Sequence, residues 1–124
     1  MNVVDSSGWL EYFADGPNAD FFTTAIKDID NLVVPSIVIL EVFKIVLRER
    51  GEGLAFQYTI QMQQGLVVPL GTGLARAAAR CGLDSKLALA DSIIWATAQA
   101  YDAVLWTQDA HFQHLDPVRF IAKR

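Results

Sequence analysis

The chain has 124 residues, 52% of them hydrophobic and 19% charged, a composition that excludes a disordered segment and fits one domain over residues 1–124. The one cysteine, Cys81, excludes an internal disulfide and a thiolate zinc site, so we expect a protein of the reducing cytoplasm. The net charge of −4 excludes a simple basic nucleic-acid binder, so either the substrate is not nucleic acid or some acids hold a metal that reverses the local field.

Short β-branched runs alternate with longer helical stretches along the chain. In the first half of the chain we expect a strand at Val3–Val4, helices at Trp9–Phe13 and Phe21–Ile29, a strand at Leu32–Pro35, and helices from Ser36 to about Arg50 and from about Leu54 to Gln63. In the second half we expect a strand at Leu66–Pro69, helices from Thr72 to about Cys81 and from Lys86 to about Tyr101, a strand at Ala103–Trp106, and a candidate fifth strand at Val118–Ile121. The longest nearly unbroken apolar stretch, Leu32 to Leu40, is far shorter than the ~20 residues of a membrane helix. The first residues lack a basic segment, so we expect neither a signal peptide nor a membrane partner.

Four residues are typical of helix ends. Pro17 suits the first turn of the second helix, and Gly82 suits the C-cap of the Ala-rich helix. Ser36 and Thr72 can cap the helices that they open. These signals define the helix boundaries that we expect.

The alternation of strands and helices predicts an α/β fold. It implies βαβ units with right-handed crossovers and a mostly parallel sheet of four to five strands that is covered on both faces. Ligands of such sheets bind beyond the carboxyl ends of the strands. Asp5 directly follows the first strand, and Thr107 and Asp109 follow the fourth, so we expect all three at this edge.

Two further acids lie in apolar surroundings. Glu41 has isoleucines four residues before and after it, and Asp91 has Leu87 and Trp95 at the same spacing. A charged carboxylate in such a place costs several kcal/mol unless it is paired or bound to a cation. Either acid alone could cap a loop or pair with a distant base.

The four acids are better explained together. Asp5, Glu41, Asp91 and Asp109 have no matching cluster of bases, and Mg²⁺ and Mn²⁺ are hard cations that take oxygen ligands. We therefore expect these carboxylates to hold one of these cations.

Hydroxyl and imidazole groups stand near the strand-end acids. Ser6 and Thr107 could orient a ligand or a metal-bound water, or they could cap the backbone at a strand end. His111 and His114, the two histidines, could share a face of a short helix, but their pattern favours solvated surface positions.

Four segments carry these residues in order along nearly the whole chain. They are Val-Val-Asp5-Ser-Ser, Pro35-Ser36-x4-Glu41-Val-Phe-Lys44, Leu89-Ala-Asp91-Ser-Ile-Ile-Trp-Ala-Thr-Ala98 and Leu105-Trp-Thr107-Gln-Asp109-Ala-His-Phe112. In this order they resemble the PIN-domain family, and within it the VapC-type toxins of bacterial toxin–antitoxin pairs. One position departs from the pattern, because many relatives have an acid where this chain has His111, which puts a second metal in question.

The resemblance implies a three-layer α/β/α sandwich and a Mg²⁺- or Mn²⁺-dependent endoribonuclease. It implies acidic site residues at Asp5, Glu41, Asp91 and Asp109 with a supporting hydroxyl at Thr107. It also implies a homodimer and a small antitoxin protein that blocks the active site.

On this interpretation, Asp5, Asp91 and either Glu41 or Asp109 hold the first cation, and a metal-activated water hydrolyses the RNA phosphodiester. The expected products carry a 5′-phosphate and a 3′-hydroxyl.

Basic residues that could bind the RNA backbone are few. Lys44 and Arg48 follow Glu41 on roughly the same helical face and, with Ser6, are the candidate substrate-binding residues. Arg76 and Arg80 are better explained as a solvated helix surface.

Other classes of protein fit the sequence less well. A phosphoacceptor receiver domain needs paired acids after the first strand and an acid after the third, where this chain has the single Asp5 and Pro69-Leu-Gly. A haloacid-type phosphatase needs an acid at the position of Ser7. A non-catalytic PIN-like scaffold that binds RNA or protein stays open because of His111.

Overall fold

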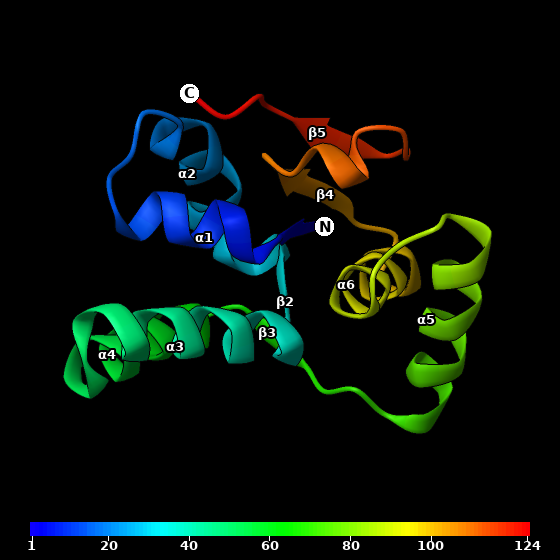
Figure 1. Cartoon of the computed structure of the whole chain (residues 1–124), viewed down its shortest axis with the longest axis horizontal. Helices are drawn as coiled ribbons and strands as arrows, with labels where there is room; N and C mark the ends of the chain where they lie inside the picture. The colour runs from blue at the N-terminus through cyan, green and yellow to red at the C-terminus, as the bar shows by residue number, and fades with distance from the viewer.

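The computed structural model describes residues 1–124 as a five-stranded parallel sheet with helices on both sides (Figure 1). The strands are β1 (Asn2–Val4), β2 (Leu32–Pro35), β3 (Leu66–Val68), β4 (Val104–Thr107) and β5 (Val118–Phe120). The α-helices are α1 (Ser6–Phe13), α2 (Ala19–Lys27), α3 (Ser36–Arg50), α4 (Glu52–Met62), α5 (Thr72–Asp84) and α6 (Leu89–Ala100). Two 3₁₀ turns, η1 (Ile29–Asn31) and η2 (Ala110–Phe112), complete the chain.

The strand order, β3-β2-β1-β4-β5, reverses direction once. Strands β2 and β3 lie on one side of β1, and the later strands β4 and β5 lie on its other side. Because parallel crossovers are right-handed, this reversal puts α1 to α4 on one face of the sheet and α5 and α6 on the other, as Figure 1 shows. The expected α/β fold with a covered parallel sheet, including the fifth strand, is confirmed.

The core lies on both faces of the sheet. The strand residues Val3, Val33 and Leu105 are completely buried, which explains why short β-branched runs suffice as strands. Helix α6 is buried along Ser92–Ala98, because it crosses β1, β2 and β4. No helix combines the length and the apolar character that a membrane crossing needs.

The predicted caps of three helices are wrong. Ser36 and Thr72 are the first helical residues, after Pro35 and Gly71, and neither helix has a side-chain cap. Pro17 lies just before α2 rather than within its first turn, because Asn18 separates the two.

The connection between α5 and α6 also differs from the prediction. Helix α5 does not end at Gly82 but continues to Asp84, and a Cβ atom added at Gly82 would make an ordinary van der Waals contact with Ser92 of α6, at 3.4 Å. Lys86 is not helical: it has φ 55°, a left-handed conformation that turns the chain, and α6 begins at Leu89. The chain therefore turns between Asp84 and Leu89, where the prediction placed the start of a helix.

Gly8 allows helix α1 to lie directly against the core. A Cβ atom at this position would be 2.6 Å from Cγ1 of Val4 and 2.7 Å from the ring of Phe22, and both of these side chains are completely buried. The close approach also brings the backbone N–H of Gly8 to the carboxylate of Asp5.

We predict that Gly8→Ala lowers the free energy of unfolding by about 1–3 kcal/mol, because the new methyl group has no free space. Urea denaturation followed by circular dichroism measures this change. Gly53→Ala is the matched control: Gly53 lies in α4, and a Cβ atom added there would have no neighbour within 4 Å, so alanine should be neutral or stabilising by up to about 1 kcal/mol. An unchanged midpoint for Gly8→Ala would contradict the close packing of α1.

Candidate active site

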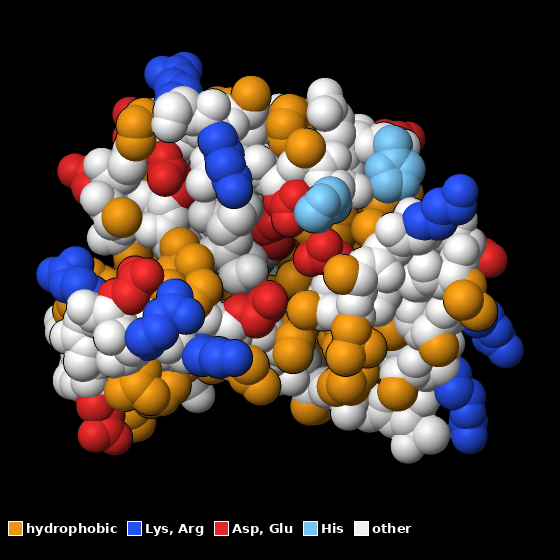
Figure 2. All heavy atoms as spheres, viewed as in Figure 1, with side chains coloured by type: hydrophobic (Ala, Val, Ile, Leu, Met, Phe, Trp, Pro, Cys, Tyr) orange, Lys and Arg blue, Asp and Glu red, His pale blue; other side chains and the backbone are white.

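The acidic residues meet where the winding of the sheet reverses, at the carboxyl ends of β1 and β4. Asp5 follows β1 and caps α1, and Asp109 follows β4 and caps η2. Glu41 reaches the same region from α3 and Asp91 from the first turn of α6. Figure 2 shows acidic side chains gathered in the middle of this face, between α1, α3 and α6, with a histidine beside them. This is the edge at which open parallel sheets bind their ligands.

Asp5 is the buried member of the group, with 2% of its surface exposed. Its Oδ1 accepts hydrogen bonds from the Ser7 hydroxyl at 2.7 Å and from the Gly8 backbone N–H at 3.0 Å. Its Oδ2 accepts a hydrogen bond from the Thr107 hydroxyl at 2.6 Å. Three donors therefore hold the carboxylate in one orientation.

Thr107 connects two of the acids. Its hydroxyl donates to Asp5 and accepts a hydrogen bond from the backbone N–H of Asp109 at 2.9 Å. The structure therefore shows the backbone-capping role of this hydroxyl and adds a contact with Asp5, while its orientation of a ligand or a metal-bound water stays a prediction.

Glu41 is half-buried on α3, and its partner is Ser6. The Ser6 hydroxyl donates to Oε1 of Glu41 at 3.0 Å. The contact joins the first residue of α1 to α3, so the carboxylate of Glu41 is oriented from the neighbouring helix. The sequence predicts that Ser6 binds substrate, whereas the contact that its hydroxyl makes in the structure is with Glu41.

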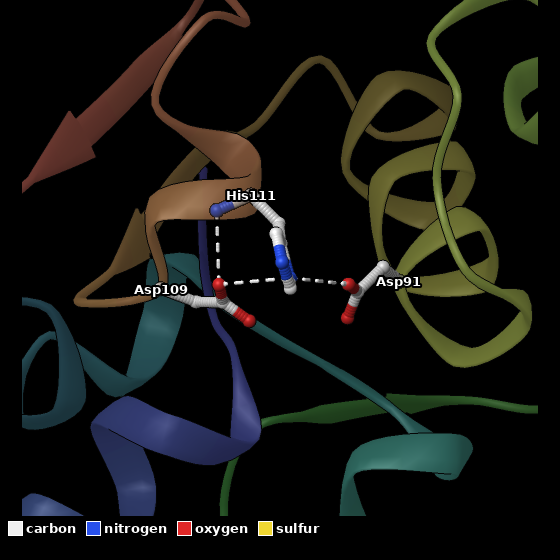
Figure 3. Close-up of side chains that lie close together, drawn as sticks. All are labelled: Asp91, Asp109 and His111. Atoms are coloured by element: carbon white, nitrogen blue, oxygen red, sulfur yellow. Dashed lines mark hydrogen bonds and ion pairs between the residues drawn. The ribbon is translucent and has the colours of Figure 1, made fainter.

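Asp91, Asp109 and His111 form the more open part of the site (Figure 3). The Nδ1 atom of His111 lies 3.2 Å from Oδ1 of Asp109 and 3.9 Å from Oδ2 of Asp91. The His111 side chain is 78% exposed, as the predicted surface position requires, but its ring nitrogen is turned toward the two carboxylates. His114 is exposed and makes no such contact.

No lysine or arginine neutralises this group of acids. Arg48 and Glu49 form the one ion pair within 4.0 Å that involves a lysine or arginine, and it lies on the exposed surface of α3. Burial, opposed by the hydrogen bonds from Thr107, Ser7 and Gly8, raises the pKa of Asp5 to about 6.

The carboxylates also influence one another. Burial raises the pKa of Asp91, and the negative charges of Asp109 and Glu41 raise it further, while His111 lowers it. The charge of Asp109 also contributes to the raised pKa of Asp5. The four acids are thus close enough to repel one another. A cation among them would offset both the cost of desolvating the carboxylates and their mutual repulsion.

The donor set fits a divalent cation. Asp91, Asp109 and His111 can each offer one ligand atom, and these atoms lie within 4.8 Å of one another. Asp5 and Glu41 are not part of this group of three, but the charge of Asp109 raises the pKa of Asp5 and that of Glu41 raises the pKa of Asp91. Oxygen-rich sets of this kind are what Mg²⁺ and Mn²⁺ take in proteins.

The two basic residues of α3 that are candidates for RNA binding lie beside one of the acids, Glu41. Lys44 and Arg48 line, together with Glu41, a hollow whose remaining walls are apolar. Basic side chains are visible over α3 in Figure 2. Arg76 and Arg80 are exposed on α5, in agreement with the predicted solvated surface.

Two polar residues that support the site were not found from the sequence. The side-chain amide of Asn18 donates to Oε1 of Gln108 at 3.0 Å and to the backbone carbonyl of Ala122 at 3.0 Å. Gln108 in turn contacts Ser7, through its backbone N–H to the hydroxyl and its side chain to the carbonyl, both at 3.4 Å. The one available signal was a glutamine between the two polar residues Thr107 and Asp109.

Solved structures share this fold over nearly the whole chain. A toxin–antitoxin complex from Klebsiella pneumoniae matches with a TM-score of 0.80 and 19% identity, over 96% of this chain and 96% of that one. VapC20 from Mycobacterium tuberculosis, a toxin that cleaves the sarcin–ricin loop, matches with a TM-score of 0.73 and 14% identity, over 91% and 93% of the two chains. VapBC2 from Rickettsia felis, bound to promoter DNA, matches with a TM-score of 0.74 and 11% identity, over 98% and 97%.

The sequence itself identifies the family. No curated protein matches it significantly. The model of the PIN domain, however, matches residues 3–117, which include both strand-end acids and both helical ones. The chain therefore belongs to the PIN-domain family.

Proposed function

We propose that this PIN domain is a Mg²⁺- or Mn²⁺-dependent endoribonuclease and the toxin of a toxin–antitoxin pair. The observation that carries the proposal is the convergence of four carboxylates, from four separate elements, without a lysine or arginine at ion-pairing distance. Such a group is costly to maintain unless a cation binds it.

In this proposal the chain's own residues hold and orient the reacting groups. Asp5, Asp91, Asp109 and Glu41 would hold the cation, which when bound supplies Lewis acidity and an activated water. Thr107 and Ser7 keep the Asp5 carboxylate in place through short hydrogen bonds. Hydrolysis by water leaves a 5′-phosphate and a 3′-hydroxyl on the RNA.

The partners proposed are an RNA substrate, a small antitoxin protein that blocks the acidic site, and a second copy of the chain in a homodimer. Membership of the PIN-domain family and the toxin–antitoxin complexes among the structural neighbours support the antitoxin. The cytoplasm, where RNA and an antitoxin would meet the protein, is its proposed location.

Asp91→Asn should abolish metal-dependent cleavage of a mixed cellular RNA pool, with a loss on the order of 10²-fold or more, because one carboxylate ligand is removed. Cleavage is followed by sequencing of RNA ends after incubation with Mn²⁺, with Mg²⁺ and with excess chelator. Asp102→Asn is the matched control: Asp102 is an exposed acid in a turn with φ 51°, which asparagine adopts easily, so cleavage should stay at the wild-type level.

Cleavage that persists in chelator or in Asp91→Asn would contradict the metal-dependent mechanism, and so would products that end in a 2′,3′-cyclic phosphate. Discrete cuts by the wild type would also identify the RNA. A folded, partner-free wild type that cuts no RNA would favour the non-catalytic binding scaffold.

The double variant Lys44→Gln/Arg48→Gln should bind single-stranded RNA more weakly, with a less steep dependence on salt. Each lost phosphate contact should reduce the slope of log affinity against log salt by about 0.7. Fluorescence anisotropy at several KCl concentrations, in the Asp91→Asn background, measures the slope without cleavage. Arg76→Gln/Arg80→Gln, on the exposed surface of α5, removes the same charge and should leave the slope unchanged. Equal effects of the two double variants would indicate nonspecific attraction.

Asp5→Asn should stabilise the metal-free protein above about pH 6 while it abolishes cleavage. The pKa of Asp5 is raised from 3.8 to about 6 in the folded protein, so its ionised form destabilises the fold above that pH, by roughly 3 kcal/mol. This destabilisation decreases as the pH falls from about 6 to 3.8, where the folded protein takes up a proton before the unfolded chain does. The gain in free energy of unfolding of Asp5→Asn over the wild type should therefore be largest at neutral pH and should decrease as the pH falls from about 6 to 3.8.

Chemical denaturation in chelator at several pH values measures this advantage. Millimolar Mn²⁺ should raise the melting temperature of the wild type and have little effect on Asp5→Asn, because binding stabilises the state that binds. A wild type that is unaffected by Mn²⁺, or a variant that is less stable than the wild type at neutral pH, would contradict the interpretation of Asp5 as a strained metal ligand.

A further inference from the structure

We propose that His111 binds the cation of this site through Nδ1 and makes it selective for first-row transition cations, such as Co²⁺ and Zn²⁺, over Mg²⁺. The inference rests on the proposed function only in requiring that the acids hold a cation. His111, which departs from the acidic pattern, would then have a chemical role of its own.

The distances between the donor atoms fit a common cation. Bonds of about 2.1 Å place neighbouring ligand atoms at right angles roughly 3.0 Å apart and opposite ones roughly 4.2 Å apart. The Nδ1 atom of His111 lies 3.2 Å from Oδ1 of Asp109 and 3.9 Å from Oδ2 of Asp91, within this range. Figure 3 shows the imidazole between the two carboxylates, one from the residue that caps η2 and one from α6.

Hydrogen bonds of the backbone fix the turn that carries His111. The N–H of His111 donates to Oδ1 of Asp109 at 2.9 Å, and the N–H of Phe112 donates to the carbonyl of Asp109 at 3.2 Å. Phe112 is completely buried and anchors the short turn in the core. His111 is therefore attached to a fixed turn although its ring is mostly exposed.

An imidazole nitrogen changes the preference of an oxygen site. Mg²⁺ takes oxygen ligands and binds nitrogen reluctantly, whereas Co²⁺, Ni²⁺ and Zn²⁺ bind imidazole well, and affinity for such sites rises from Mn²⁺ toward Cu²⁺. The imidazole also adds a donor atom without adding a negative charge to a set of acids that already repel one another. The expected result is weaker attraction for Mg²⁺ and a stronger one for transition cations.

The alternative is that His111 only donates a hydrogen bond to Asp109, in which case no metal–nitrogen bond forms. His111→Ala removes the nitrogen, and His111→Asp replaces it by the common carboxylate. His114→Ala is the matched control, since His114 is the other exposed histidine, three residues further along the chain.

The test measures metal binding by the purified protein without RNA. Calorimetric titration with Co²⁺ and with Mg²⁺ should show that His111→Ala weakens Co²⁺ binding by on the order of tenfold or more but changes Mg²⁺ binding by less than about threefold. His111→Asp should shift the preference toward Mg²⁺, and His114→Ala should bind both cations as the wild type does. Electron spin-echo spectroscopy of the Mn²⁺-loaded protein should detect a directly bound ¹⁴N in the wild type and in His114→Ala, and none in His111→Ala.

Three results would overturn the inference: a wild type that binds no cation, a wild-type spectrum without bound nitrogen, or equal losses of Co²⁺ and Mg²⁺ affinity in His111→Ala. Circular dichroism melting of each variant establishes that it is folded. The result is independent of nuclease activity, because bound nitrogen in a protein that cuts no RNA would remove the proposed function and leave His111 as a ligand. Conversely, a protein that cuts RNA but binds the cation through oxygen atoms alone would support the proposed function and exclude His111 as a ligand.

Discussion

The hydrogen bond from Thr107 to Asp5 joins the ends of β1 and β4, and the other acidic side chains are arranged around this junction. The two strands are neighbours because the winding of the sheet reverses between them, so the carboxyl ends of both open onto the same space. The backbone N–H of Asp109 binds the same threonine hydroxyl, which connects the third acid to the first. Helices α3 and α6, from opposite faces of the sheet, then add Glu41 and Asp91.

Burial of Asp5 is the main energetic constraint of this arrangement. Three hydrogen bonds only partly offset the loss of solvation, and the pKa of Asp5 stays raised, at about 6. The fold tolerates this because the large apolar core of strands and α6 stabilises the rest of the molecule. A site that is destabilised when empty is ready to bind a cation, since the binding energy then also relieves the repulsion among the acids.

The charge distribution explains how an acidic protein could act on RNA. With a net charge of −4, the chain as a whole repels a polyanion, but Lys44 and Arg48 stand beside Glu41 at the border of the acidic group. A bound cation would reverse the field at the centre, and the basic residues of α3 would continue the attractive surface outward. His111 would add a nitrogen donor to the oxygen set without adding negative charge.

Most of the fold was predictable, because hydrophobic periodicity records which residues are buried. The strands, the alternation with helices and the two acids in apolar surroundings could be recognised in this way, and the order of the motifs indicated the family. The end of α5 and the start of α6 could not, since α5 continues past the capping signal at Gly82 and the chain turns at Lys86 in a left-handed conformation.

The amino-acid sequence by itself determined the class of fold, the acids at the strand ends and on the helices, and the lack of a cluster of bases that matches the four acids. Only the tertiary structure decided which groups meet: Asn18 with Gln108, Ser6 with Glu41, and His111 with Asp91 and Asp109. The physical reason is that a polar side chain at a loop or helix end follows no periodic pattern. Its partner is chosen by the reversal of strand order and by helix packing, which bring together residues far apart in the chain.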